Sequence, residues 1–224
     1  MLHIIQNDPE VPPGNITENL DILETMYFIH YPYQGDPLPD LRDVTSLVVL
    51  GGAMGANDDE RYPFLKQLKT FIGKIVERQI PYLGICLGGQ LLSAACGGRA
   101  VSGRWEELGT LSVDLTEEGK LDRLFSGIED RFTTFQWHHD SFDIPPGAAL
   151  LAGSPACPHQ AFRIGNCAWG TQFHPEVSES IIRNWCAWDP KTKERADELA
   201  TEWQNASGYA KTARLILENF LKMP

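Results

Sequence analysis

"PYLGICLGGQLLSAACGG", residues 81–98, joins an apolar, strand-like run to a helical pattern through a single cysteine. The pattern predicts a strand over 82–85, a sharp turn at Cys86 and a helix over 87–96. The G-x-C-x-G arrangement is the thiol counterpart of the G-x-S-x-G nucleophile elbow, in which a tight strand-to-helix turn pushes the central side chain out of the sheet. Glycine on either side leaves room for such a turn. We therefore expect an α/β fold with Cys86 at the end of a strand.

Cys86 is the candidate nucleophile of the chain. The helix after it would offer unpaired N–H groups and the positive end of its dipole, which favour a thiolate and a developing oxyanion. A free thiol has a pKa of about 8.5, so a nucleophile needs such a setting and a neighbouring base. The alternative is a small buried residue beside a tight turn. Cys96, Cys157, Cys167 and Cys186 have no comparable setting, and we expect Cys96 to lie in the core.

A base for this thiol has to come from elsewhere in the chain. In "GTQFHPEV", residues 170–177, His174 ends an apolar run and is followed by Pro175 and Glu176. Proline biases the residue before it towards extended backbone, in which residues i and i+2 point to the same side. Glu176 could then orient one ring nitrogen of His174 and turn the other towards a thiol, as in a catalytic triad. The alternative is a structural histidine at a strand end.

Composition limits the partners of the chain. Nineteen Lys and Arg against thirty Asp and Glu give a net charge of −11 over 224 residues, which opposes binding to nucleic acid or to anionic membranes. Five cysteines without a C-x-x-C pair suggest neither a disulfide framework nor a four-thiolate zinc site. The first ten residues lack a basic segment with a long apolar core, and no apolar window is long enough to span a membrane. We therefore expect a cytoplasmic protein without a nucleic-acid or membrane partner.

Apolar runs alternate with helical patterns in the first hundred residues, which is typical of a sheet covered by helices on both faces. We expect strands at 2–6, 25–29, 45–50 and 82–85, and helices at 15–24, 63–79 and 87–96. The middle third shows strands joined by turns, which predicts an antiparallel extension of a mostly parallel sheet. Three helical segments follow Val177, divided near 189–190 and 207–208. We expect one α/β domain over 1–224, with the helical segment 177–224 packed on it.

Four stretches together resemble the successive signatures of the class I (triad) glutamine amidotransferases. They are "VVLGGAMG" (48–55), "PYLGICLGGQLL" (81–92), "FQWHHDSFDIPPGA" (135–148) and "GTQFHPEV" (170–177), in the family's order and at similar separations. The resemblance runs from the first strand to about Val177 and continues loosely through the C-terminal helices. It implies a stand-alone glutaminase-type domain that needs no cofactor and no metal.

The resemblance also implies roles for individual residues. Cys86 is similar to the family's nucleophile, His174 to its general base and Glu176 to the residue that orients the base. Gly52 resembles the position whose backbone N–H joins that of Leu87 in the oxyanion hole.

Further positions match the family's substrate site. Gln90 matches the side chain that helps to hold the substrate glutamine, and the stretch Trp137, His138, His139 and Asp140 matches the one that receives its amino-acid end. His139 stands where the family often has glycine, which affects substrate preference rather than the triad. For Asp140 a turn cap is the alternative to an ammonium site, and for His138 a hydrogen-bonded structural role is favoured over a second base. The adjacent histidines match no known metal signature.

The implied reaction is hydrolysis of the side-chain amide of glutamine through a cysteinyl γ-glutamyl thioester. The chain has no G-x-x-x-x-G-K-[ST] phosphate loop and no length for a synthetase domain, so an acceptor for the ammonia would lie on a separate polypeptide. Two alternatives stay open: a free-standing γ-glutamyl hydrolase or peptidase, and a non-catalytic binding module, for which a broken triad would be expected. For Trp185, Trp188 and Trp203 we expect packing, with a partner interface as the alternative.

Overall fold

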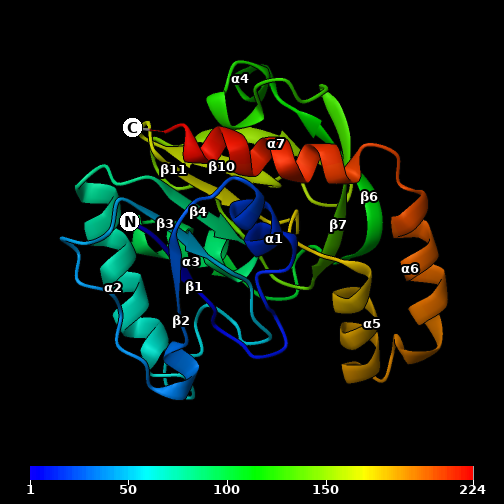
Figure 1. Ribbon diagram of the computed structural model, residues 1–224, viewed down its shortest axis with the longest axis horizontal. Coiled ribbons are helices and arrows are strands. Elements are labelled where there is room, and N and C mark those ends of the chain that lie inside the picture. The colour runs from blue at the N-terminus through cyan, green and yellow to red at the C-terminus, as the bar shows by residue number, and fades with distance from the viewer. Residues whose placement is uncertain (224) are drawn as a thin grey trace.

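The computed structural model describes residues 1–223 of the chain (Figure 1). The strands of its main sheet are β1 (Leu2–Ile5), β2 (Tyr27–His30), β3 (Ser46–Val49), β4 (Tyr82–Ile85), β6 (Glu107–Leu115), β7 (Arg131–His138), β9 (Ala149–Gly153), β10 (Ala161–Ile164) and β11 (Ala168–Thr171). Two further strands, β5 (Ala100–Val101) and β8 (Ser141–Phe142), form a small antiparallel pair beside it.

The main sheet has the order β2-β1-β3-β4-β11-β10-β9-β6-β7. The neighbouring pairs from β2 to β11 are parallel, and those from β11 to β7 are antiparallel. This confirms the expected α/β fold with an antiparallel extension. The parallel pairing of β4 with β11 places Ile85 opposite Thr171, so the chain leaves both strands at the same edge of the sheet.

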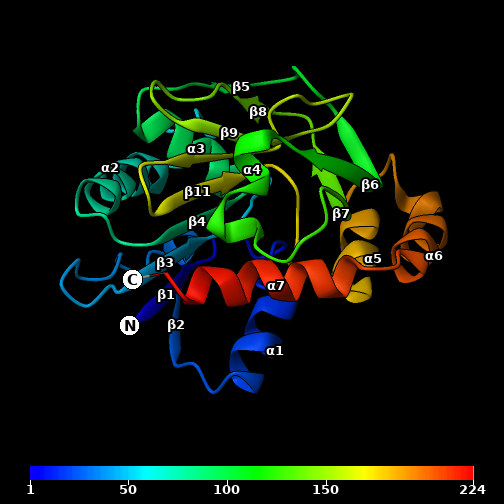
Figure 2. The same ribbon diagram turned by 90° about the horizontal axis from the view of Figure 1, so that it is seen from above.

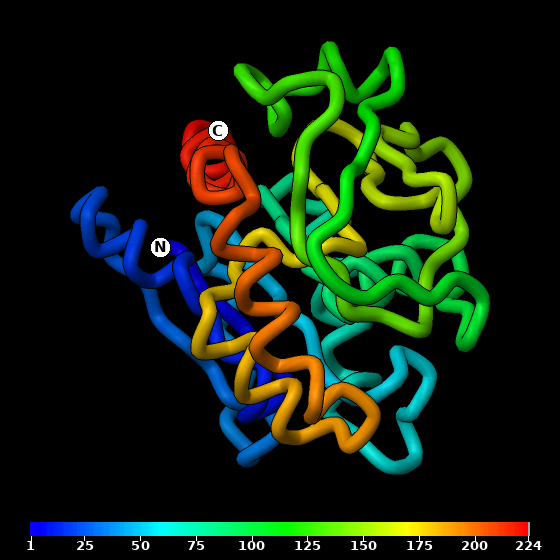
Figure 3. Tube along the Cα trace, turned by 90° about the vertical axis from the view of Figure 1, so that its right-hand side faces the viewer, coloured from blue at the N-terminus to red at the C-terminus, as the bar shows by residue number. Residues whose placement is uncertain are grey.

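Helices cover both faces of the parallel half of the sheet. The helices of the structure are α1 (Asn15–Ile22), α2 (Phe64–Glu77), α3 (Leu87–Ala95), α4 (Glu117–Lys120), α5 (Glu179–Trp188), α6 (Ala196–Asn205) and α7 (Tyr209–Leu221). In Figure 2, α2 and α3 lie on one side of the sheet and α1 and α7 on the other. Helices α5 and α6 pack against each other beside the antiparallel half, as the orange segments of Figure 3 show. Within residues 1–223, no helix combines the length and apolarity needed to cross a membrane.

The parallel strands are buried on both faces, and their side chains alternate between two cores. Ile4 and Val48 belong to the core under α1 and α7, whereas their neighbours Ile5 and Val49 belong to the core under α2 and α3. All four side chains are fully buried. A strand that supplies two cores has to be apolar at consecutive positions, which explains why these strands read as unbroken apolar runs.

The helices and strands expected from the sequence are present in the structure, with bounds that differ by a few residues. The C-terminal helices are divided close to the expected positions 189–190 and 207–208, because α5 ends at Trp188, α6 ends at Asn205 and α7 begins at Tyr209. The proline-rich stretch 31–40 contains one 3₁₀ turn at Pro32–Gln34. Strand β9 and the single turn α4 were not expected, because an apolar run of a few residues and a four-residue helix carry little periodicity.

The turn between β4 and α3 is crowded by backbone rather than by side chains. A Cβ atom added at Gly84 would lie 2.4 Å from the carbonyl of Gly88, and one added at Gly88 would lie 2.1 Å from the carbonyl oxygen of Val49. Backbone cannot move aside as a flexible side chain can. Glycine at both positions therefore allows α3 to begin directly against the sheet.

Gly84→Ala should lower the free energy of unfolding by about 1–3 kcal/mol or more, because the added methyl group has no space. Gly73→Ala is the matched control, since Gly73 lies inside α2 with no atom within 4 Å of an added Cβ. The control should raise the free energy of unfolding by about 0.5–1 kcal/mol through the better helix propensity of alanine. Urea unfolding of both variants measures the difference, and equal stabilities would contradict this packing.

Candidate active site

Cys86 occupies the turn between β4 and α3 with strained backbone dihedrals, φ 51° and ψ −106°. A positive φ is uncommon for a residue with a side chain and costs of order 1–3 kcal/mol, so it persists only where the surroundings impose it. Here the Cys86 N–H donates to the carbonyl of Thr171 at 2.8 Å, and the Cys86 carbonyl accepts from Gln90 N–H at 3.0 Å. The thiol therefore stands at the N-terminal end of α3, as the elbow pattern predicts.

His174 follows β11 and reaches the same edge of the sheet. Its Nδ1 lies 2.6 Å from Oε1 of Glu176, and its backbone N–H donates to the carbonyl of Phe135 at 2.8 Å. The ring of Trp185 packs edge-on against the imidazole, with centroids 5.0 Å apart. With Nδ1 engaged by the carboxylate, Nε2 is the ring nitrogen left to serve a thiol, and His174 and Cys86 line the same cavity.

The protonation of His174 is set by opposing effects. Burial by itself lowers the pKa of His174, but the charges of Glu176 and Cys86 outweigh burial and raise this pKa to about 10. Glu176 is fully buried, so its charge acts through little solvent. At neutral pH the imidazole therefore carries its proton, which makes the ring an acid ready to serve a leaving group.

Gly51 lies against both of these side chains. A Cβ atom added to it would be 3.2 Å from Cε1 of His174 and 3.6 Å from Cβ of Cys86. The absence of a side chain at this position therefore lets the imidazole and the thiol approach each other. Gly51 was not predicted as a site residue, although the Gly-Gly pair directly after the strand is visible in the sequence.

Gly52 and Leu87, the expected oxyanion-hole residues, are neighbours in space. An added Cβ at Gly52 would lie 2.8 Å from the Leu87 side chain. Leu87 opens α3, where the first N–H groups have no acceptor within the helix. The loop that carries Gly52 is fixed by the segment after β1, because Oδ2 of Asp8 accepts the Ala53 N–H at 3.0 Å and the side chain of Asn7 donates to the carbonyl of Leu50 at 2.7 Å. Gly52 therefore lies beside Leu87, and the oxyanion-hole role of their two backbone N–H groups stays a prediction.

Gln172 is a site residue that the sequence analysis missed. Its Nε2 lies 3.5 Å from the sulfur of Cys86, and its Oε1 accepts from Nε2 of Gln90 at 3.3 Å. Both glutamines are buried. The position of Gln172, two residues before His174 in the same extended segment, was the available signal. The pair directs an amide N–H group at the thiol.

Two cavities meet at Cys86 and share Gly52, Ala53, Trp137 and Trp188. The larger one, about 350 Å³, extends to Gln90, His138, His139, Asp140 and Lys191, and we call it the polar lobe. The smaller one, about 70 Å³, extends to Glu10, Val11, His174 and Trp185, and we call it the tryptophan lobe. Trp188 is exposed. The end of α5 thus contributes to the walls of the site, in addition to the packing expected for Trp185.

The stretch 137–140 borders the polar lobe, but its polar side chains already have protein partners. The ring nitrogens of His138 lie 3.1 Å from the Asp140 carbonyl and 3.1 Å from Oε2 of Glu107. Exposed His139 pairs with Glu106 at 2.9 Å. Oδ1 of Asp140 accepts from the Ser102 hydroxyl at 2.7 Å and from the Gly103 N–H at 3.0 Å. A turn-fixing role therefore accounts for one oxygen of Asp140.

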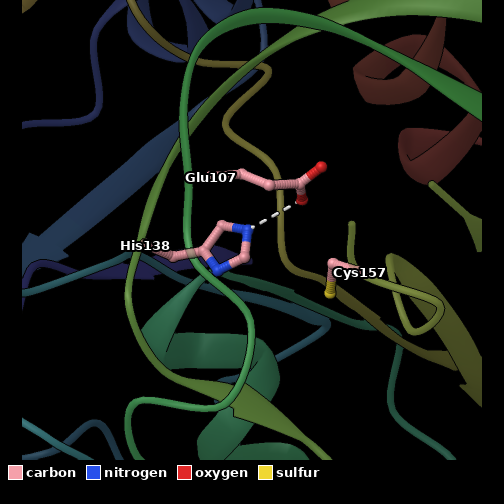
Figure 4. A group of neighbouring side chains, drawn as sticks. All are labelled: Glu107, His138 and Cys157. Carbon is pink, nitrogen blue, oxygen red and sulfur yellow. Dashed lines mark hydrogen bonds and ion pairs between the residues drawn. The ribbon is translucent and has the colours of Figure 1, made fainter. Parts of the chain in front are cut away.

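A second Cys-His-Glu group lies apart from Cys86. Figure 4 shows Glu107, His138 and Cys157, whose donor atoms lie within 4.8 Å of one another. Such a set could hold Zn²⁺. However, Glu107 also accepts hydrogen bonds from Ser154 at 2.7 Å and from Gln160, so its carboxylate is satisfied by the protein.

Cys157 differs from Cys86 in the properties that matter for a nucleophile. It is fully buried, and burial raises the pKa of its thiol. Its sulfur contacts the Ser141 hydroxyl and the His159 carbonyl, each at 3.5 Å. The group around Cys157 is therefore a hydrogen-bonded network that holds the 137–140 turn.

The chain is similar in sequence to proteins of one known family. The sequence model of the family "Glutamine amidotransferase class-I" matches residues 22–184, more than half of the chain. One subunit of the glutamine-hydrolyzing GMP synthase of Methanococcus maripaludis is 36% identical over 48% of this chain, and the match spans 59% of that protein, less than two thirds of its length. The corresponding GMP synthase subunit from Pyrococcus abyssi is 30% identical over 66% of this chain and 79% of its own.

A solved structure agrees over the whole fold. A glutamine amidotransferase from Thermotoga maritima superposes with a TM-score of 0.89 and 29% sequence identity, covering 99% of this chain and 98% of its own. The expected family resemblance is therefore confirmed.

Glu176→Gln should lower the pKa of His174 by about 1–3 units, because the substitution removes a buried charge that favours the imidazolium. In the unaltered protein the ring should stay protonated through neutral pH and lose its proton near pH 10. The ¹⁵N chemical shifts of the ring nitrogens report this titration. Glu106→Gln, beside exposed His139, is the matched control and should leave His174 unchanged. An unaltered midpoint in Glu176→Gln would contradict the role of the carboxylate.

Proposed function

Because this chain belongs to the class-I glutamine amidotransferases, we propose that it hydrolyses the side-chain amide of glutamine through a γ-glutamyl thioester on Cys86. Membership of this family implies the general activity of an amide hydrolase. The single observation that supports the finer proposal is the meeting of Cys86 with the His174–Glu176 pair at the rim of a cavity. In the second Cys-His-Glu group, His138 borders the polar lobe, but the thiol of Cys157 is fully buried.

In the first half of the reaction, the Cys86 thiolate attacks the side-chain carbonyl carbon and a C–S bond forms. The carbonyl oxygen becomes an oxyanion beside the N–H groups of Gly52 and Leu87. As the C–N bond breaks, the electron pair stays on nitrogen and His174 gives it a proton. Ammonia leaves, and the glutamyl group remains on the sulfur as a thioester.

In the second half, His174 takes a proton from water and the resulting hydroxide attacks the thioester carbonyl. The C–S bond then breaks, glutamate leaves and the thiolate–imidazolium pair is restored. Glu176 favours the imidazolium form in both halves, because its buried charge raises the pKa of the ring. Loss of one oxyanion donor would reduce turnover by about 10²- to 10³-fold.

The use of the ammonia is the second part of the proposal. Two relatives of this chain are named as one subunit of a glutamine-hydrolyzing GMP synthase, a name that implies another subunit in those proteins. We propose by analogy that ammonia from this chain passes to an acceptor on a separate polypeptide. A non-catalytic module is disfavoured because the thiol, imidazole and carboxylate are all present.

Cys86→Ala should reduce glutamine hydrolysis by at least about 10³-fold, because the variant lacks the sulfur on which the thioester forms. Cys157→Ala is the matched control, since Cys157 also lies beside a histidine and a glutamate, and it should keep most of the turnover. Release of glutamate from glutamine measures both variants, and circular dichroism checks the fold. Substantial turnover by folded Cys86→Ala would refute the assignment, and so would a loss in folded Cys157→Ala as large as the one expected for Cys86→Ala.

A further inference from the structure

We propose that this site also hydrolyses N-substituted γ-glutamyl amides, and that the tryptophan lobe binds the apolar chain of their leaving amine. The inference rests on the proposed function, because it uses the same thioester on Cys86. It adds a substrate class in which the amide nitrogen carries an aliphatic group.

The two lobes at Cys86 suit different halves of a substrate. A general acid must lie within hydrogen-bond reach of the atom that it protonates. His174 borders the tryptophan lobe and Gln90 borders the polar lobe, and neither residue borders both. The leaving nitrogen therefore faces the tryptophan lobe, and the glutamyl half extends into the polar lobe.

The charges at the site support this orientation. The glutamyl half of any substrate carries an α-ammonium and an α-carboxylate. Asp140 and Lys191 border the polar lobe and offer charges of both signs. The tryptophan lobe is lined by one acidic residue, exposed Glu10, and otherwise has aromatic or aliphatic walls next to His174.

The tryptophan lobe is larger than ammonia requires. A water-sized molecule needs about 10–15 Å³ of cavity volume measured in this way, whereas the lobe holds about 70 Å³. The space fits an amine with a short chain of several carbon atoms.

The walls of the lobe also favour an apolar group. Trp137, Trp185 and Trp188 line it together with Val11. The indole N–H of Trp185 already donates to the carbonyl of Glu10 at 2.6 Å, so the polar atom of this ring is engaged. Ammonia gains nothing from such walls, whereas an alkyl chain gains the free energy of leaving water.

The chemistry needs no group beyond those of the proposed function. The thiolate of Cys86 attacks the γ-carbonyl carbon, the bond to the substituted nitrogen breaks, and the electron pair stays on that nitrogen. The imidazolium of His174 supplies the proton, so a neutral primary amine leaves. Water then releases glutamate from the thioester. One amide and one water give one glutamate and one amine.

The test compares L-γ-glutamyl-n-butylamide with L-glutamine on the full-length protein. Glutamate and butylamine are measured by amine derivatisation and chromatography, and the readout is the ratio of the two kcat/KM values. We expect the butylamide to be favoured by about tenfold, the lower end of what an apolar pocket contributes to discrimination. A ratio below one would overturn the inference, and the lobe would then be an exit route for ammonia.

Two variants tie the preference to the lobe. Val11→Phe fills it and Trp188→Ala removes an exposed wall, so each should lower the butylamide-to-glutamine ratio by about tenfold. Phe28→Ala is the control, because Phe28 is another exposed aromatic side chain but lines neither lobe, and it should keep the ratio near that of the unaltered protein. Because Trp188 is exposed, its replacement tests the proposal even if Val11→Phe fails to fold. An unchanged ratio in folded variants would overturn the proposal.

Failure of this inference differs from failure of the proposed function. If glutamine is hydrolysed and the butylamide is not, only the inference fails. If neither compound is hydrolysed, 6-diazo-5-oxo-L-norleucine, a glutamine analogue that alkylates active-site thiols, separates the cases. Absence of its label from Cys86 would refute the proposed function, whereas labelling without butylamide turnover would overturn only the inference.

Discussion

The parallel pairing of β4 with β11 is the constraint on which the site depends. The hydrogen bond from Cys86 N–H to the Thr171 carbonyl, 2.8 Å long, is the last link of that pairing. Adjacent strands lie about 4.8 Å apart, so residues just beyond two paired strand ends are within side-chain reach. The thiol of Cys86 at the end of one strand and the imidazole of His174 beyond the end of the other therefore meet, although the two residues are 88 positions apart in the sequence.

The rest of the fold holds the imidazole and its carboxylate in place. The Tyr209 hydroxyl, at the start of α7, donates to the carbonyl of His174 at 3.0 Å. From the other side, Asn15 in α1 donates its backbone N–H to the carbonyl of Glu176 at 2.9 Å. The free energy cost of burying the Glu176 charge is large unless a positive partner is present, and protonated His174 is that partner. Replacement of either residue by a neutral one would therefore leave the charge of the other buried without a partner.

Much of this arrangement could be predicted from local pattern. The elbow at Cys86 depends on nearby glycines, and the contact of His174 with Glu176 depends on extended backbone before a proline, so both are visible in short stretches of sequence. Gly51, Gln172 and the tryptophan lobe were not predicted, because each acquires its position only when distant segments pack. Trp185 and Trp188 of α5 line the tryptophan lobe only because α5 packs against β7, and no local sequence pattern predicts that contact. Equally, the sequence offered no reason to place Glu107 beside Cys157.

The central claim is that Cys86, and no other thiol, carries the glutamyl group. The most direct measurement is an acid quench of the protein during turnover with glutamine, followed by proteolysis and mass spectrometry of the cysteine-containing peptides. The account predicts a γ-glutamyl group on Cys86 that disappears when the substrate is exhausted. An acyl group on Cys157, or turnover without any acylated cysteine, would contradict it.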